Sequence, residues 1–312
     1  MTPQLTFVIG CTGSGKAALG QFLARRAGGE IISLDSMKVY RRMNIGTAKP
    51  SPAALAEVPH HLIDVVEPSE EFSVAQYVAL AERAIADIHQ RGKPIFVVGG
   101  TPMYFKALTE GLFEGPGADP ALRAQLQETA RVEGLNVLYE RMRLVDPVAG
   151  ERIHPNDLRR IVRALEVYEL TGRPITALQQ QWDRDRVQYD CRGFGLRRTM
   201  VDQNSRTNER VRRMLDAGLV EEVARLLAEP RPLSTAARQA LGYAEIIRHL
   251  QGEVSLADAV ELIKINTRQF AKAQRTWFKR FRGTHWIDVA ADATVAQVAA
   301  MVDATVTPAT EP

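Results

Sequence analysis

The first hundred residues alternate between short apolar runs and longer segments that carry apolar side chains at helical spacing. The runs LTFVIG (5–10), EIISLD (30–35) and PIFVVGG (94–100) each have the length of a buried strand and end in glycine or a polar residue. Residues 16–27 and 73–92 have helical periodicity, and Gly92 ends the second segment. This order predicts a parallel sheet with helices on both faces.

The pattern changes after a cluster of glycine and proline at residues 115–120. Residues 121–182 are helical in pattern throughout, and the clearest helix begins near Asn156 or Asp157 and ends at Gly172. CRGFGL (191–196) predicts a return strand, helical spacing continues from Ser205 to Arg282, and HWIDV (285–289) predicts a last strand. We therefore expect a core of 1–116 and 193–304, mostly helical in its second part, a helical insertion at 117–192, and a disordered tail at 305–312.

The loop after the first strand carries candidate chemistry. GCTGSGKA matches the glycine and lysine positions of a phosphate-binding loop, but Ala17 stands where a hydroxyl is expected. Such a loop directs backbone N–H groups and the next helix's N-terminus at phosphate oxygens, and Lys16 adds a cation. The alternative is an ordinary strand–turn–helix. The fold class we predict is α/β, a P-loop NTPase-like parallel sheet flanked by helices with an all-helical insertion domain.

Two further residues follow strands and therefore should lie at the same edge of the sheet. Asp35 comes directly after the second strand, where a carboxylate can accept a proton from a nucleophile, although it can equally cap a turn. Thr101 follows the strand ending in Gly99 and Gly100, where an enzyme that transfers phosphate often has an aspartate for Mg²⁺. The threonine suggests that phosphate is the leaving group and that something else is transferred.

A basic stretch near the C-terminus suggests an RNA surface. Although the net charge is only +3, residues 262–287 contain no acidic residue. Positions 264, 268, 272, 275, 279 and 282 are basic at steps of three and four, which predicts one face of one helix. Ile263, Phe270, Trp277 and Phe281 are expected to form a second, apolar stripe on the core. A solvated basic face is the alternative, but the missing carboxylates favour phosphate contact.

Taken together, the motifs resemble those of the bacterial tRNA dimethylallyltransferases over roughly residues 5–288. In order and spacing these are GCTGSGK, EIISLDSMKVYRRMNIGTAKP, VPHHLIDVVEP, VVGGT, RIHPNDLRRIVRALEVYELTGRP, LGYAEI and TRQFAKAQRTWFKRF. The resemblance implies transfer of an isopentenyl group from dimethylallyl diphosphate to N6 of the adenosine 3′ of the anticodon, with release of pyrophosphate. It also implies Mg²⁺ as cofactor, although Ala17 offers no side-chain ligand.

The same resemblance implies residue roles. Asp35, Thr101 and Lys16 are the expected catalytic residues: Asp35 orients the adenine amine and takes its proton, and Thr101 donates near the bridging oxygen. The expected diphosphate ligands are Gly10, Cys11, Thr12, Gly13, Ser14, Gly15, Lys16, Ala17 and Arg210. The expected tRNA-binding residues are Asp35, Ser36, Met37, Lys38, Thr101, Arg123, Arg159, Arg160, Ile161, Val162, Arg163, Arg268, Lys272, Arg275 and Lys279. Basic surfaces on two domains are expected to hold the anticodon stem-loop, with the target base out of its stack.

The chain departs from the family pattern at four positions. The family usually has threonine or serine at 17, glutamine at 38, glycine at 102 and arginine at 273, whereas this chain has Ala17, Lys38, Pro102 and Ala273. Pro102 removes a backbone N–H beside Thr101 but is compatible with the first turn of a helix. These changes bear on metal dependence and rate.

Composition sets the remaining expectations. Two cysteines, no signal-peptide pattern and no long apolar stretch favour a cytoplasmic protein that does not enter a membrane, and we expect a monomer. Two rival functions stay open at this point. One is a P-loop kinase or a prenyltransferase that acts on a free adenine nucleotide, which needs neither insertion nor basic helix. The other is an RNA-binding relative that has lost catalysis, which Ala17 suggests.

Overall fold

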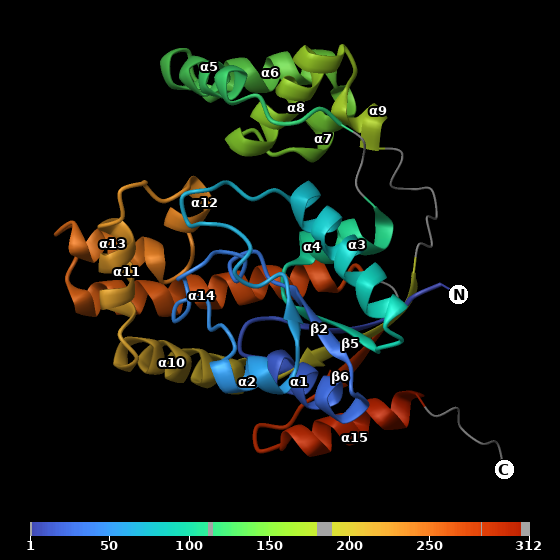
Figure 1. Ribbon diagram of the computed structural model, residues 1–312. Helices are drawn as coiled ribbons and strands as arrows, with labels where there is room; N and C mark the ends of the chain where they lie inside the picture. The colour runs from blue at the N-terminus through green and yellow to red at the C-terminus, as the bar shows by residue number, and fades with distance from the viewer. Residues whose placement is uncertain (1, 112–114, 180–188, 282, 307–312) are drawn as a thin grey trace. The chain divides into compact units, whose positions relative to one another are not determined.

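The computed structural model describes residues 2–111, 115–179, 189–281 and 283–306 (Figure 1). Contacts divide the chain into two units, one of residues 1–109 with 188–312 and the other of residues 110–187. The insertion expected at 117–192 extends too far, because the fifth strand begins at Asp190 and residues 190–192 belong to the sheet. The expected tail at 305–312 begins too early, because the last helix continues to Val306, and its remaining residues lie outside the described part.

The first unit is built on one six-stranded sheet in the order β3-β2-β4-β1-β5-β6. The strands are β1 (Gln4–Gly10), β2 (Glu30–Leu34), β3 (His60–His61), β4 (Ile95–Gly99), β5 (Asp190–Arg197) and β6 (Thr284–Asp288). All five pairings are parallel. The predicted α/β class is therefore confirmed, and the wholly buried β2 and β4 explain their nearly continuous apolar sequences.

Helices cover both faces of this sheet, because successive strand residues point to opposite sides (Figure 1). On one face Val8 and Val98 pack against α1 (Lys16–Ala27) and α15 (Val295–Val306). On the other face Phe7 and Val97 pack against α3 (Val74–Gln90), α4 (Pro102–Glu110) and α14 (Leu256–Phe278). The loops that follow β1, β2 and β4 therefore meet at one edge, between two helical layers.

The long segment between β2 and β3 is held against a group of C-terminal helices. These helices are α10 (Met200–Asp216), α11 (Leu219–Leu227), α12 (Thr235–Arg238) and α13 (Tyr243–Leu250), and α2 (Pro52–Glu57) lies within the segment itself. The Glu222 carboxylate accepts hydrogen bonds from the backbone N–H groups of residues 44, 45 and 46 and from the Tyr243 hydroxyl at 2.6 Å. A Cβ on Gly46 would lie 2.4 Å from the Tyr243 ring. The segment that carries Lys38 and Lys49 is thus anchored at residues 44–46, between the two lysines.

The second unit is a small helical bundle with its own core. It contains α5 (Pro120–Val132), α6 (Leu135–Val145), α7 (Pro147–Arg152), α8 (Leu158–Thr171) and α9 (Ile175–Gln179). Its buried residues include Leu138, Ile161 and Leu165. Asp157 caps α8 by accepting a hydrogen bond from the Arg160 N–H at 3.1 Å, and Gly172 ends it in a left-handed conformation with φ 66°, as the sequence predicted. Among the helices of the described residues, none is long and apolar enough to cross a bilayer.

Candidate active site

The loop from Gly10 to Lys16 joins β1 to α1 and has the backbone that a phosphate-binding loop needs. Gly13 and Gly15 have φ angles of 84° and 97°, which side chains other than glycine's rarely allow, and Gly15 caps the N-terminus of α1. The free N–H groups of the first turn of α1 therefore face the loop. The Lys16 ammonium lies across the loop and donates to the Cys11 carbonyl at 3.2 Å. The arrangement favours an anion.

Asp35 and Thr101 meet at the carboxyl ends of two adjacent strands. The Leu34 carbonyl at the end of β2 accepts from the N–H groups of Gly100 and Thr101 at 3.0 and 3.1 Å. The Ser36 N–H donates to the Thr101 hydroxyl oxygen at 3.1 Å, so the hydroxyl proton remains free to donate to a ligand. The neighbouring Pro102 is the first residue of α4, where its missing N–H costs no helical hydrogen bond.

The Asp35 carboxylate has one oxygen engaged. Its Oδ1 accepts from the N–H groups of Met37 at 2.9 Å and Lys38 at 3.3 Å, which makes Asp35 the cap of the turn after β2. No hydrogen bond of Oδ2 is found within the described residues, so this oxygen keeps its lone pairs. Capping a turn and accepting a proton are therefore compatible for this side chain.

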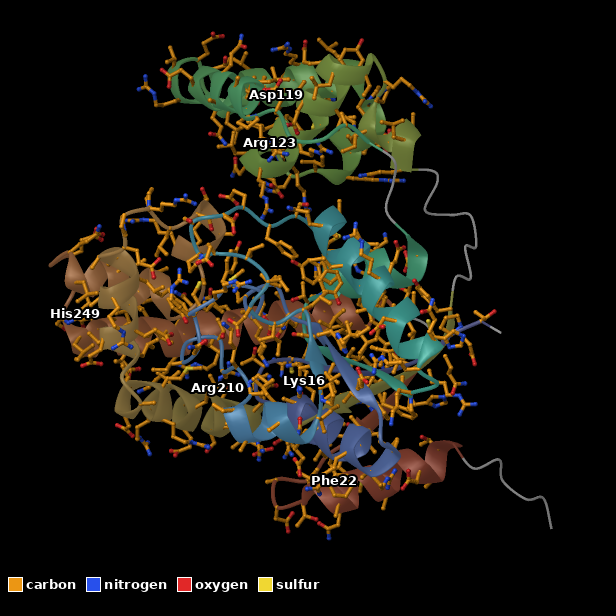
Figure 2. The ribbon with its side chains drawn as sticks, viewed as in Figure 1. Lys16, Phe22, Asp119, Arg123, Arg210 and His249 are labelled. Atoms are coloured by element: carbon orange, nitrogen blue, oxygen red, sulfur yellow. The ribbon has the colours of Figure 1, made fainter. Side chains whose placement is uncertain are left out.

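Three partly buried cations, Lys16, Lys38 and Arg210, interact electrostatically with Asp35. Burial lowers the pKa of Lys16 to about 8, with Asp35 opposing and Arg210 adding to the shift. The pKa values of Lys38 and Arg210 are also lowered, first by burial, and Asp35 opposes both shifts. Lys16 comes from the start of α1 and Arg210 from α10, as Figure 2 shows. One carboxylate cannot balance three ammonium and guanidinium groups, so this part of the protein is prepared for a negatively charged ligand.

Two glutamines that the sequence did not single out fix the loop in place. The Gln274 amide on α14 donates to the Gly100 carbonyl at 2.5 Å and accepts from the Thr12 N–H at 2.9 Å, joining the loops after β1 and β4. Gln203 on α10 donates to the Thr12 carbonyl at 2.7 Å and accepts from Arg275 at 3.0 Å. Both side chains are buried; Gln274 lies in the TRQFAKAQRTWFKRF motif without having been given a role there, and Gln203 lies in no motif that was singled out.

Arg198 is a third residue that sequence analysis missed. Its guanidinium donates to the Ser14 carbonyl at 2.9 Å and forms an ion pair with Asp202 at 2.8 Å, and its side chain is only 4% exposed. The Ser14 hydroxyl is itself buried and without a hydrogen-bond partner in the described part of the chain. A buried hydroxyl that faces no partner is a position that a ligand oxygen can satisfy.

The basic positions of α14 are partly as predicted. Lys272 is exposed, and Lys279 is exposed at the C-terminal cap, while the helix itself ends at Phe278 and Arg282 lies outside the described residues. Arg275 turns inward to Gln203, and the Arg268 guanidinium donates to the Lys264 carbonyl. Whether these side chains bind tRNA stays a prediction.

The expected apolar stripe is confirmed at Ile263 and Phe281, which pack in the core, but not at Trp277, which is only partly buried and outside the core clusters of the described residues, or at Phe270. Phe270 is 44% exposed, whereas Phe278, which was not assigned to the stripe, is fully buried in the core beside Phe105 and Phe281. The buried face of α14 consists of Ala259, Ile263, Thr267, Ala271, Gln274 and Phe278. It contains small and polar residues because this side of the helix packs against the phosphate-binding loop as well as against the sheet.

The residues expected to bind tRNA from the insertion divide into two groups. Arg159 and Arg160 are exposed on α8. Arg123 and Arg163 instead form ion pairs with Glu166, at 2.8 and 2.6 Å, and Glu166 has no exposed surface. The side chains of Ile161 and Val162 lie in the core of the bundle, and a contact of these two residues with tRNA stays a prediction. They are the apolar members of an amphipathic helix.

Position 17 does not fit a side-chain-bound magnesium ion. Ala17 offers a methyl group on the first turn of α1, and Lys38, a cation, lines the same cavity. Magnesium prefers oxygen ligands, and a nearby ammonium repels it. Within the described residues, no group of three histidine, cysteine, aspartate or glutamate side chains could hold a metal ion. We therefore derive no step of the reaction from a protein-bound metal.

The sheet, the loop and the cationic cluster define an enzyme with a P-loop NTPase-like fold that binds a phosphorylated ligand. Residues 38–281 match the family model of IPP transferase, and residues 3–67 match that of isopentenyl transferase. The chain belongs to the IPP transferase family, as the motifs suggested.

Relatives and solved structures agree with this assignment. The chain is 49% identical to the tRNA dimethylallyltransferase of Geobacter metallireducens, with 91% of this chain and 92% of that protein covered, and 46% identical to that of Geobacter sulfurreducens, with 93% of both covered. It also resembles the crystal structure of the tRNA isopentenylpyrophosphate transferase of Bacillus halodurans, with a TM-score of 0.69, 36% identity and 97% and 96% of the two chains covered. A eukaryotic dimethylallyltransferase crystallised acting on tRNA matches with a TM-score of 0.78, 27% identity and 100% and 81% covered.

Proposed function

We propose that this protein transfers the dimethylallyl group of dimethylallyl diphosphate to N6 of the adenosine 3′ of the anticodon in tRNA and releases diphosphate. The observation that carries the proposal is the cluster of Lys16, Lys38 and Arg210 around Asp35, next to a loop with phosphate-binding geometry. The family membership and the tRNA dimethylallyltransferase relatives support the same reaction.

The leaving group sets the first task of the site. When the allylic carbon–oxygen bond breaks, its electron pair passes to a diphosphate oxygen, and fixed cations lower the energy of that charge without reorganising. In our proposal Lys16, Arg210 and the N–H groups of residues 13–16 hold the diphosphate. The Thr101 hydroxyl, whose oxygen already accepts from the Ser36 N–H, donates to the bridging oxygen.

The nucleophile sets the second task. As the bond from N6 to the allylic carbon forms, the amine must lose a proton, and the free Oδ2 of Asp35 is the acceptor in this proposal. The turn that Asp35 caps holds the carboxylate at the carboxyl end of β2, so the proton acceptor and the diphosphate loop are parts of one edge of the sheet.

The remaining expectations are part of the proposal. The anticodon stem-loop is the RNA partner, with the exposed Lys272 and Lys279 of the first unit and the exposed Arg159 and Arg160 of the second as phosphate contacts. Any Mg²⁺ that accompanies the diphosphate would be held by the diphosphate oxygens, by water and by groups such as Thr12, since position 17 supplies no ligand. The protein is expected to act as a cytoplasmic monomer.

The test uses purified protein, dimethylallyl diphosphate and an unmodified anticodon stem-loop with adenosine beside the anticodon. Mass spectrometry of the RNA is expected to show the gain of one isopentenyl unit, and a stem-loop with guanosine at that position serves as the matched control. Modification of free AMP but not of RNA would favour the free-nucleotide reaction. RNA binding without any turnover would favour a relative that has lost catalysis.

A further inference from the structure

Two departures from the family pattern meet in one cavity. Ala17, which directly follows the phosphate-binding loop on the first turn of α1, and Lys38, three residues after Asp35, both line a cavity of about 290 Å³. Ser33, Lys49 and His60 line it as well. The cavity therefore lacks the hydroxyl that the family usually has at position 17, and it contains the additional cation of Lys38.

The Lys38 side chain is partly buried, and its ammonium has no direct partner among the described residues. No hydrogen bond or ion pair of this group is found within the described residues, although its backbone N–H donates to Asp35. The nearby Asp64 carboxylate is already paired with the Lys49 ammonium at 2.5 Å. Keeping a lysine charged and unpaired in such a place costs free energy, so a ligand is the natural source of compensation.

The charges around the loop show what that ligand must be. Lys16, Lys38 and Arg210 each interact favourably with the Asp35 charge, while Arg210 opposes the charged forms of both Lys16 and Lys38. Three cations and one carboxylate leave an excess of positive charge, which complements the several negative charges of a diphosphate. A site of this charge does not require a divalent cation to bind the same ligand.

We propose that the Lys38 ammonium takes the place of a loop-bound magnesium ion: it donates to and neutralises the diphosphate beside Ala17, so that this protein binds diphosphate without a divalent metal. This inference rests on the proposed function, because it assumes that the loop holds the diphosphate of the prenyl donor. It assigns Lys38 to the leaving group, whereas sequence analysis had assigned it to tRNA.

The experiment measures the binding of inorganic diphosphate by calorimetry, in EDTA and in excess Mg²⁺. The unmodified protein is expected to bind in EDTA, with affinity that changes less than about threefold when Mg²⁺ is added. Lys38→Gln should bind at least about tenfold more weakly in EDTA, a loss of about 1.4 kcal/mol. Lys38→Arg, which keeps the charge, should retain most of the affinity.

A second variant replaces the Lys38 ammonium by a hydroxyl at position 17. Ala17→Thr combined with Lys38→Gln restores a hydroxyl and removes the ammonium, and it should bind diphosphate tightly only when Mg²⁺ is present. Lys93→Gln is the matched control, because Lys93 is an exposed lysine that does not line the cavity, and its replacement removes the same charge. Thermal unfolding of each variant in the absence of ligand checks that the fold is kept.

The outcomes separate the two proposals. If diphosphate binds under neither condition, the loop is not a diphosphate site and the proposed function fails with it. If the unmodified protein binds only with Mg²⁺, or if Lys38→Gln binds in EDTA as tightly as the unmodified protein, the assignment of Lys38 is overturned while the proposed function stands. If Lys38→Arg loses as much affinity as Lys38→Gln, charge is not the contribution of this residue.

Discussion

Both units of the molecule place cationic side chains around a carboxylate, but they balance the charge differently. In the second unit Arg123 and Arg163 both bond to the single buried Glu166. Burial alone would raise the pKa of Glu166, yet the hydrogen bonds from the two arginines lower it below its usual value. In the first unit three cations share Asp35, and burial lowers the pKa of each of them.

The direction of these shifts separates a structural ion pair from a binding site. Where the chain supplies the counter-charge, the carboxylate is held ionised and the arginines fix the fold. Where the cations lack partners, their charged forms are destabilised until a ligand arrives. From sequence alone, Arg123 and Arg163 of the second unit had been expected to bind tRNA.

The largest effect is expected when the carboxylate of Asp35 in the first unit is removed. Asp35→Ala should lower turnover about 10²–10⁴-fold with tRNA affinity nearly unchanged, as expected for a general base. Asp35→Asn keeps the turn-capping oxygen and should lose turnover to a similar extent with the fold intact. Single-turnover assays with the stem-loop measure this, and unchanged turnover would remove Asp35 from the mechanism.

The second prediction breaks the balanced pair. Arg123→Met with Arg163→Met leaves Glu166 buried and unpaired, which should destabilise the helical bundle by about 3–5 kcal/mol. Diphosphate affinity should stay the same, because the loop belongs to the other unit. Arg159 is exposed on α8, the helix that also carries Arg163, and Arg159→Met should alter stability by less than about 0.5 kcal/mol. Urea unfolding monitored by hydrogen exchange measures the stability of the bundle separately from the rest of the chain. If Arg159→Met lowers that stability as much as the double change does, Arg123 and Arg163 do not have the proposed structural role.

The third prediction has the opposite sign. Arg210→Met removes a buried cation that lacks a full partner, so the ligand-free protein should become more stable by about 1–2 kcal/mol. The same change should weaken diphosphate binding by tenfold or more. Thermal unfolding with and without diphosphate measures both effects, and loss of stability without ligand would show that Arg210 is a structural residue like Arg163.

The fourth prediction concerns the exposed cations. Lys272→Ala with Lys279→Ala should weaken stem-loop binding and reduce the slope of log affinity against log salt by about 1 for each lysine. These residues make a cleaner test than Arg275, whose guanidinium bonds to Gln203. A slope equal to that of the unmodified protein would mean that this part of α14 does not contact RNA.

The smallest expected effect is a dependence on pH. The pKa of Lys16, lowered by burial to about 8, is influenced by Asp35, Arg210, Cys11 and Lys38. The ligand-free lysine loses its proton as pH rises through about 8, so diphosphate affinity should fall above that pH and be constant below it. Calorimetry from pH 6.5 to 9.5 tests this, and Lys16→Arg should remove the decline because an arginine stays charged.

Sequence predicted most of the fold because strand burial and loop chemistry are local signals. The runs at 5–10, 30–35 and 94–100 became β1, β2 and β4, and the glycines of the loop have the positive φ angles that their spacing implied. The error at Phe270 arose because helical period alone cannot say what lies opposite each position. The buried face of α14 carries a glutamine, Gln274, where an apolar residue would be expected, because this part of the helix contacts a polar loop.

Residues that act through distant partners were beyond the reach of sequence. Gln203 and Gln274 meet the loop from positions roughly 190 and 260 residues away, and Glu166 gives no sign in sequence that it binds two arginines. The expected roles of Arg123 and Arg163 therefore could not be separated from those of the exposed Arg159 and Arg160.

The helix α14 carries a consequence for the order in which two substrates bind. Its Gln274 occupies the Thr12 N–H at the loop, while Lys272 and Lys279, on either side of it in sequence, face outward. If Lys272 and Lys279 contact RNA as predicted, α14 would join that contact surface to the diphosphate loop, so a displacement at one site could be transmitted to the other. The two substrates would then not bind independently of each other. The measured affinity for RNA should depend on whether diphosphate is bound, and the affinity for diphosphate on whether RNA is bound.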